Sequence, residues 1–337
     1  MDWFEKLIGF RETDYEETRR RLRVEGNRLY SPTNGASYGI GELELVPLQA
    51  LRERVVFASG PTRRLKTSVV TGDVRAMHRS PDNAGAMFQV ASQFNLLEMA
   101  SPDVTPEYGI TCYQSDLTQG PACAIAAGAA TIFRNYFVPI AGKKGQTATR
   151  QLDGLADLGA ALSLATKLPA DNLWTMRNGY ALATQTGLDA IGHHLEILAA
   201  ERIDELRGKL RIGIHRDVEV TEADGPNRTY VSQAFCSALP VAYSRVGSAH
   251  WEPFASIVLE AAYEATLWAA VLNSQRGGPN VVFLTLLGGG AFGNHSRWIH
   301  AAMHRALKLL VRFDLDVRLV SYGTPSKDLC EIAEEFQ

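Results

Sequence analysis

The sequence predicts an α/β fold, because strand-like and helix-like segments alternate along most of the chain. Short apolar runs rich in β-branched residues recur after position 65, such as KTSVV and NVVFLTLL. Segments with apolar residues at helical spacing lie between them, most clearly SRWIHAAMHRALKLLVRF. Hydrophobic residues make up 46% of the 337 residues and charged residues 21%, as in a folded domain with a sizeable core.

The alternating pattern divides the chain into a main domain and additions. Residues 1–64 are predicted to form an N-terminal appendage, with a charged helix over 14–23 and a short strand around 43–46. The α/β domain covers 65–323, and two long segments of helical spacing make a largely helical insertion at about 140–210. Residues 324–337 are predicted to form a tail helix.

Within the α/β domain, KTSVV is the first predicted strand and MFQVAS the second. The small-residue run GPACAIAAGAATIFRNYF is predicted to be helical, and its alanines would let it pack closely. LRIGIHRDVEV and TYVSQAF follow the insertion as strands, and ASIVLEAAYEATLWAAVL as a long buried helix. The last unit is strand NVVFLTLL, loop GGGAFGN, a helix, and strand LDVRLVSYG.

Charge and cysteine content narrow the kind of protein. The net charge is −3, from 34 basic and 37 acidic residues, so the sequence has no basic footprint for nucleic acid or a membrane surface. Four cysteines are spread singly, which fits a reducing, cytoplasmic setting and gives no zinc or redox pair. The charged start lacks the apolar core of a signal peptide, and His193-His194 lacks the spacing of a metal site. We therefore predict a soluble, cytoplasmic protein without metal or cofactor.

The clearest chemical motif is the loop at 288–293, GGGAFG, between a strand and a helix that begins near Ser296. Glycines there remove side chains and let backbone N–H groups approach an anion, and a helix N-terminus adds its positive dipole end. The loop also fits GxGxxG, but a dinucleotide site needs an acidic residue at the end of the next strand. That strand ends LVSYG, without an acid, which excludes this alternative.

In four ordered places the sequence resembles the macrodomain family. VVTGDV matches a strand ending in GD(I/V), and FQVASQFN matches the VNAAN-like element, with Asn95 as its final Asn and Ser92 in place of the first. TQGPACAIAAGAA fits the first glycine loop and its helix, and LTLLGGGAFG fits the second loop. The resemblance implies a three-layer α/β/α fold with a mixed central sheet and a partner that is ADP-ribose or an ADP-ribosylated substrate.

The resemblance also implies roles for particular residues. Asp73 would accept a hydrogen bond from the adenine amino group beside the backbone of Val74; capping of the next helix is its alternative. Asn95 would bind the distal ribose, or end its strand in an Asx turn. Phe292 would stack on the ribose or plug the core. The residues implied to enclose the diphosphate and distal ribose are Gly120 of the first loop and Gly288, Gly289, Gly290, Ala291, Phe292, Gly293 and Asn294 of the second.

Whether the chain is an enzyme depends on a group near the distal ribose. A hydrolytic branch of the family has an Asp in the first loop, where this sequence has Gln119, Gly120 and Pro121. Asn95, Asp116 and His295 are the catalytic candidates that we retain. Further carboxylates that would substitute if the loop took another path are Glu98, Asp103 and Glu107.

Three functions therefore stay open. The chain hydrolyses an ADP-ribosyl linkage, or it reads an ADP-ribose-like nucleotide signal without catalysis, or its α/β scaffold binds another phosphate ligand.

Overall fold

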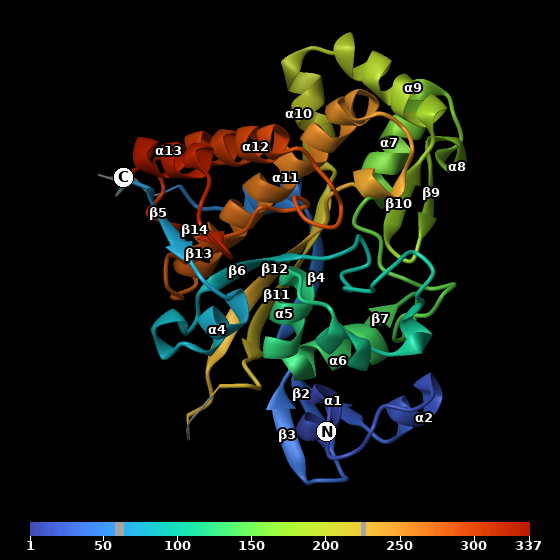
Figure 1. Ribbon diagram of the computed structural model, residues 1–337, viewed down its shortest axis with the longest axis vertical. Helices are drawn as coiled ribbons and strands as arrows, with labels where there is room; N and C mark the ends of the chain where they lie inside the picture. Colours follow the sequence, from blue (N-terminus) through green and yellow to red (C-terminus); the bar gives the residue numbers. More distant parts are fainter. Residues whose placement is uncertain (58–63, 224–226) are drawn as a thin grey trace.

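The structure, a computed structural model, describes residues 1–57, 64–223 and 227–337. Its centre is a seven-stranded mixed sheet in the order β4–β11–β12–β6–β13–β14–β5 (Figure 1). The strands from β12 to β5 run parallel to one another, whereas β11 is antiparallel to both of its neighbours. The seven strands are Glu42–Pro47 (β4), Lys66–Thr71 (β5), Met87–Ala91 (β6), Arg211–Glu219 (β11), Tyr230–Cys236 (β12), Val281–Leu284 (β13) and Asp316–Ser321 (β14).

Helices cover both faces of this sheet, so the predicted three-layer α/β/α arrangement is confirmed (Figure 1). On one face α11 packs on the central strands with α3, α9 (Gln185–Glu196), α10 (Ala200–Gly208) and α12 around it, and α13 lies beside α12 and β5. On the other face lie α4, α5 and α6. These helices are Leu48–Arg54 (α3), Val74–Arg79 (α4), Gln119–Ala126 (α5), Gly128–Tyr136 (α6), Ser248–Gln275 (α11), Ser296–Leu309 (α12) and Lys327–Glu335 (α13).

Helix α11 forms the centre of the core. By length and composition it is apolar enough to cross a membrane, but 83% of its most apolar window is buried inside the protein. Trp251, Phe254 and Tyr263 are among its fully buried side chains. This burial identifies α11 as the core helix that the sequence predicts.

The N-terminal segment carries its own small core. Its helices and a three-stranded sheet bury Phe4, Ile8 and Leu29 against Ile132 and Tyr136 of α6. β4, which falls inside the predicted appendage, forms an edge strand of the central sheet. The elements of this segment are Trp3–Ile8 (α1), Tyr15–Arg20 (α2), Arg23–Glu25 (β1), Arg28–Ser31 (β2) and Ala36–Gly39 (β3).

The insertion at about 140–210 contains four helices and most of two short hairpins. Its second predicted helix is divided, because Ala199 is extended between α9 and α10. The hairpin β9–β10 was not predicted, although its Asn178-Gly179 turn, with φ of 47° and 79°, is a strong hairpin signal. The elements are Pro139–Ile140 (β7), Lys143–Lys144 (β8), Ala156–Thr166 (α7), Ala170–Leu173 (α8), Trp174–Arg177 (β9), Tyr180–Ala183 (β10), Gln185–Glu196 (α9) and Ala200–Gly208 (α10). Short 3₁₀ turns occupy Pro81–Asn83, Pro106–Tyr108, Thr111–Ser115 and Val241–Tyr243.

Two predicted elements differ from the structure because residues distant in the sequence contact them. The small-residue helix breaks at Ala127, where the Thr221 hydroxyl accepts the N–H of Gly128 and side chains of α1 leave no room for a Cβ at Gly128. The strand predicted over 280–287 ends at Leu284, because side chains, rather than a neighbouring strand, bond the backbone of Thr285.

Candidate functional site

A pocket of about 400 Å³ opens at the carboxyl edge of the parallel strands. Residues that follow β5, β6, β12, β13 and β14 line it, because parallel strands all end at the same edge of a sheet. The charged side chains among the described lining residues are Asp73, Glu98 and Asp116, and none is Lys or Arg. An anion in this pocket would therefore be held by backbone N–H groups and neutral polar side chains rather than by cations.

The second glycine loop supplies such groups. The N–H groups of Gly290, Ala291 and Phe292 donate to nothing in the part of the chain that the structure describes, and all three residues line the pocket. Gly288 shapes the loop, because its φ is 75° and a Cβ there would lie 2.4 Å from that of Ala238. At Gly290 a Cβ would meet nothing within 4 Å. The loop is thus open on its pocket side and tightly packed behind.

The N-terminus of α5 forms the opposite wall. The N–H groups of Gln119 and Gly120 precede the first bond of the helix, from Ala122 to Thr118, and Thr118 gives no side-chain cap. Gly120 packs directly on the end of β6, where a Cβ would lie 2.1 Å from the Ala91 oxygen. Uncapped N–H groups and the helix dipole favour an anion here.

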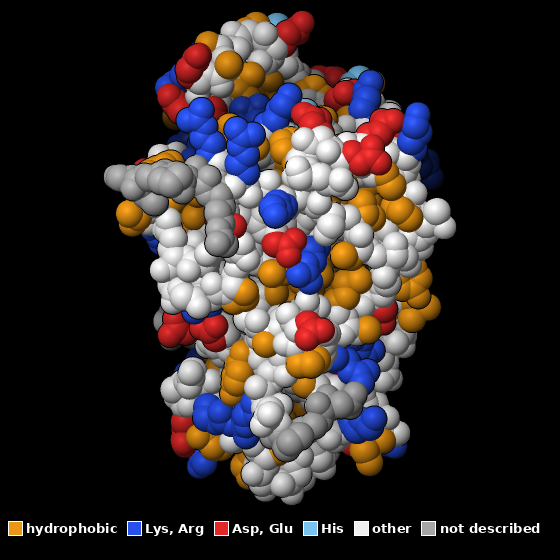
Figure 2. Space-filling view, turned by 90° about the vertical axis from the view of Figure 1, so that its left-hand side faces the viewer, with side chains coloured by type: hydrophobic (Ala, Val, Ile, Leu, Met, Phe, Trp, Pro, Cys, Tyr) orange, Lys and Arg blue, Asp and Glu red, His pale blue; other side chains and the backbone are white. Residues whose placement is uncertain are grey.

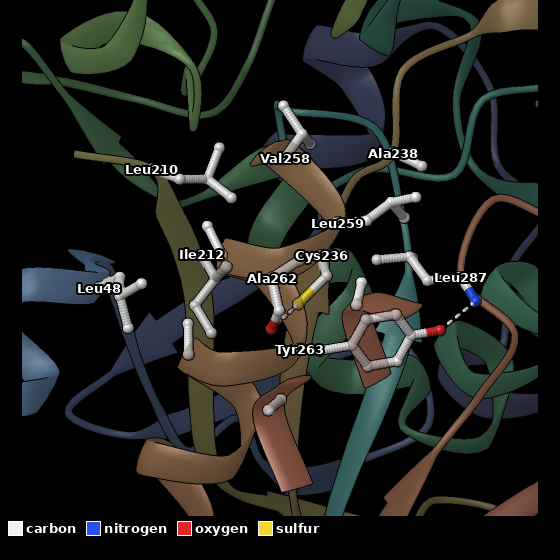
Figure 3. Packing of buried hydrophobic residues seen from close by; sticks show 14 of the residues in the cluster. Leu48, Leu210, Ile212, Cys236, Ala238, Val258, Leu259, Ala262, Tyr263 and Leu287 are labelled. Carbon is white, nitrogen blue, oxygen red and sulfur yellow. Dashed lines mark hydrogen bonds between the residues drawn. The ribbon is translucent and has the colours of Figure 1, made fainter. Parts of the chain in front are cut away.

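Buried side chains hold both walls from behind. The Gln119 amide bonds the backbone of Gln89 and Ala91, and the Gln89 side chain accepts the N–H of Thr285. The Tyr263 hydroxyl donates to the Thr285 oxygen at 2.5 Å and accepts the Leu287 N–H at 2.9 Å. Figure 3 shows this phenol reaching from α11 to Leu287. The start of the glycine loop is therefore fastened to the core helix.

One end of the pocket presents Asp73 and Tyr322. Ser321 pairs with Thr71 at the ends of β14 and β5, which brings the residues that follow them together. Asp73 caps α4 by accepting the Arg75 N–H at 2.8 Å with Oδ1, so the capping alternative holds for that oxygen. Tyr322 is 84% exposed and lines the pocket.

The chain that follows β6 contributes a buried carboxyl group to the pocket lining. Glu98 is 3% exposed, and its Oε1 lies 3.4 Å from Nη2 of Arg134, while Oε2 has no partner among the described residues. Burial raises the pKa of Glu98 to about 7, against the opposing effect of Arg134. A carboxyl group with this pKa exchanges a proton near neutral pH, as acid–base catalysts do.

Aromatic side chains close the pocket beside Glu98. The Phe292 ring centroid lies 5.2 Å from that of Tyr180 and 5.8 Å from that of Tyr243. Tyr180 comes from the inserted hairpin β9–β10, and its hydroxyl donates to the Met99 oxygen at 2.7 Å. The insertion thus supplies part of the pocket wall.

The structure places eight of the predicted site residues along this pocket: Asp73, Val74, Asp116, Gly120, Gly288, Gly290, Ala291 and Phe292. Asp116 accepts the N–H of Thr118 at 2.8 Å, just before α5. It is the one residue of the three catalytic candidates that lines the pocket.

Asn95, Gly289, Gly293, Asn294 and His295 are not among the described lining residues. Asn95 is fully buried, accepts the Leu97 N–H and donates to Gln151, so its side chain is committed to the fold. Asn294 bonds the oxygens of Leu239 and Gly288 and closes the loop. His295 is exposed before α12, whose N-terminus likewise lies outside the pocket. The helix N-termini at the pocket are that of α5, which has no side-chain cap, and that of α4, which Asp73 caps.

Several lining residues were not anticipated, namely Gln119 as an anchor, Thr285, Tyr180, Tyr243, Ser321 and Tyr322. Tyr322 had a usable signal, since it lies at the end of the predicted strand LDVRLVSYG, and that end must lie at the same edge as Asp73. Tyr180 had no such signal, because the insertion that contains it has no counterpart in the macrodomain motifs.

The fold and site define a class: an α/β protein of macrodomain-like architecture, with a pocket between a glycine-rich loop and the N-terminus of α5 at the carboxyl ends of parallel strands. The sequence matches no protein-family model and no curated protein.

Among solved structures, the chain is similar to poly(ADP-ribose) glycohydrolase from Thermomonospora curvata, with a TM-score of 0.46, 14% identity, and 92% of this chain and 94% of that chain covered. The same enzyme with the inhibitor ADP-HPD gives a TM-score of 0.45 and 13% identity, covering 92% and 93%. The glycohydrolase from Deinococcus radiodurans in complex with ADP-ribose gives 0.42 and 12%, covering 87% and 93%.

Proposed function

We propose that the protein binds ADP-ribose, or an ADP-ribosyl group, in the pocket at the strand ends. The observation that carries the proposal is the pair of facing walls with uncommitted backbone N–H groups, at Gly290–Phe292 and at the start of α5. Donors held in place by the backbone suit a diphosphate, because they need no side-chain ordering when it binds.

Other lining residues of the pocket support the rest of the ligand. Oδ2 of Asp73 remains available to accept a hydrogen bond from an adenine amino group, and the exposed Tyr322 ring offers a surface for the base. Glu98, on the chain after β6, offers an acceptor without a partner, which suits the hydroxyl groups of a ribose. The strand order β5–β14–β13–β6 runs from Asp73 through the glycine loop to the strand that precedes Glu98, and ADP-ribose has a base, a diphosphate and a second ribose.

Calorimetry with the full chain tests the proposal. ADP-ribose should bind saturably and more tightly than AMP, which lacks the second phosphate and the distal ribose. A heat for pyrophosphate or another phosphate ligand without one for ADP-ribose would favour the third function, a scaffold for a different anion. No heat and no thermal shift with millimolar ADP-ribose would refute the proposal.

Glu98 favours a second candidate function, hydrolysis of the linkage at the distal ribose. In its protonated form Glu98 would donate its proton to the oxygen that leaves the anomeric carbon as their bond breaks. Water would then add to that carbon and return a proton to the carboxylate. The raised pKa, about 7, keeps a substantial fraction of Glu98 protonated near neutral pH.

Release of ADP-ribose from an ADP-ribosylated substrate separates hydrolysis from binding alone. Glu98→Gln should slow release by about 100-fold or more while ADP-ribose still binds, because the amide keeps the shape but has no proton to give. The wild-type rate should fall as pH rises through about 7. Asp116→Asn is the matched variant in the same pocket. A loss there, with Glu98→Gln active, would assign the role to Asp116; no release by the wild type would leave a non-catalytic reader.

A further inference from the structure

A second, differently built hollow lies between the N-terminal segment and the insertion. Its volume is about 430 Å³, and the described residues that line it are Glu16, Arg19, Lys143, Lys144 and Arg150. All five are charged, and four of them are basic. The hollow is formed by α2, the strand β8 and the chain just after it.

The two arginines of this hollow are held in place. Arg19 donates through Nη1 to the Lys144 oxygen at 3.1 Å and through Nη2 to Glu16 at 2.7 Å. Arg150 donates through Nη2 to the same oxygen at 3.2 Å and through Nε to the Gly145 oxygen at 3.1 Å. Two guanidinium groups therefore meet at one carbonyl, and each has five N–H donors, so several remain for a ligand.

The two lysines form β8, which directly follows a tight turn. Ala141 and Gly142, with φ of 48° and 76°, form the two-residue turn between β7 and β8. Gly145 follows with φ of 80°. A Cβ there would lie 2.3 Å from the Tyr15 hydroxyl, so the backbone at Gly145 is in close contact with Tyr15. Both lysines are exposed, and neither has a carboxylate within ion-pair distance among the described residues.

The charge of the hollow is not balanced locally. Glu16 is paired with Arg19 and is the one acidic side chain in the lining that the structure describes. Glu107 lies nearby, outside the lining, and its carboxylate keeps its charge while it accepts the N–H of Ala148, so two carboxylates face four cations. On the face shown in Figure 2, by contrast, Lys and Arg are interspersed with Asp and Glu. In a chain of net charge −3, four converging cations raise the free energy of the empty site and lower that of an anion complex.

We propose that this hollow is a second anion site, which binds a compact phosphate-bearing group such as a diphosphate. Guanidinium groups fit phosphate oxygens in pairs, and the ammonium groups add point charges that adapt to different ligands. The site is independent of the pocket, because the two share no lining residue.

Inorganic pyrophosphate, titrated calorimetrically into the full chain at low ionic strength, tests this proposal. The double variant Lys143→Gln/Lys144→Gln should bind it about tenfold more weakly or worse, since two charge-assisted contacts are lost. The control is Lys209→Gln/Lys308→Gln, which removes the same charge at two exposed lysines elsewhere. It should bind like the wild type.

The Gly290→Glu variant distinguishes the hollow from the pocket. Pyrophosphate binding that depends on Lys143 and Lys144 should persist in Gly290→Glu, whatever happens to ADP-ribose. Equal affinity in the two lysine double variants would overturn the proposal. So would pyrophosphate binding that disappears in Gly290→Glu alone, because that result assigns all of it to the pocket. Neither outcome bears on whether ADP-ribose binds.

Discussion

The pocket and the basic hollow would bind an anion through different kinds of group. The pocket lines its walls with backbone N–H groups and has acidic side chains but no Lys or Arg among its described residues. The hollow is lined by charged side chains alone, four of them basic. Backbone N–H groups are neutral donors whose positions the fold fixes. Cationic side chains carry the charge that balances an anion, and their flexibility lets them adapt to ligands of different shape. We therefore expect the pocket to select shape and the hollow to select charge.

The largest effect should come from filling the pocket. Gly290→Glu puts a side chain and a negative charge into open space beside the free N–H groups, so ADP-ribose binding should be abolished with the fold intact. Gly247→Glu is the control, because Gly247 is exposed, unstrained and outside the pocket. Calorimetry and thermal melting measure both variants. Wild-type affinity in a folded Gly290→Glu protein would remove this loop from the site.

Base selection is the next effect in size. Asp73→Ala should weaken ADP-ribose binding by about 1–3 kcal/mol and lose most of the preference over inosine diphosphate ribose, because a hypoxanthine carbonyl offers a carboxylate no donor. Asp73→Asn separates base recognition from capping, since Asn also caps helices. It should retain thermal stability but lose the preference. An unchanged ratio of the two affinities in both variants would show that Asp73 only caps α4.

Salt dependence compares the two sites directly. Raising the salt concentration should weaken pyrophosphate binding at the hollow several-fold, because exposed charges are screened over about 10 Å at 0.1 M. ADP-ribose binding in the pocket should weaken less, since no cationic side chain is among its described lining residues. Parallel titrations at two salt concentrations measure both slopes. Equal slopes would contradict the distinction between the sites.

A smaller effect should follow from loosening the glycine loop. Tyr263→Phe removes the hydroxyl that bonds Thr285 and Leu287 but keeps the buried ring. ADP-ribose affinity should fall a few-fold, by about 1 kcal/mol, while affinity for adenosine, which has no diphosphate, stays unchanged. Tyr38→Phe, whose hydroxyl bonds the Leu7 oxygen, is the control. An equal loss for adenosine and ADP-ribose would indicate general damage rather than loop positioning.

The smallest effect concerns stability and pH. Burial raises the folded-state pKa of Glu98 to about 7, above its unfolded value, so its stabilising contribution is complete at low pH. That contribution is lost as pH rises through about 7, and Glu98→Gln has no such dependence. Going from about pH 5 to about pH 8, the variant's Tm should therefore improve relative to the wild type. A constant Tm difference would mean that Glu98 is ionised throughout.

Much of the fold was predictable, because strand and helix periodicity is a local property of the chain. The strands after Thr221 and the helix at Ser296 follow from apolar patterns of a few residues each. The hairpin β9–β10 was equally local and was missed despite its Asn-Gly turn. The end of β13 at Leu284 was not predictable, because Gln89 and Tyr263 decide it from distant positions.

The sequence by itself determined that Asp73 and the glycine loop at 288–293 follow predicted strands, and parallel strands bring such ends to one edge. Only the tertiary structure decided the rest. Asn95 matches the final Asn of its motif, but its side-chain amide donates a hydrogen bond to Gln151 of the insertion. Glu98 is one of several carboxylates on a loop, and burial beside Arg134 singles it out. The basic hollow is invisible in a chain of balanced charge, because Arg19 meets Lys144 and Arg150 only after folding. Burial and charge density depend on which distant segments meet, and composition does not record that.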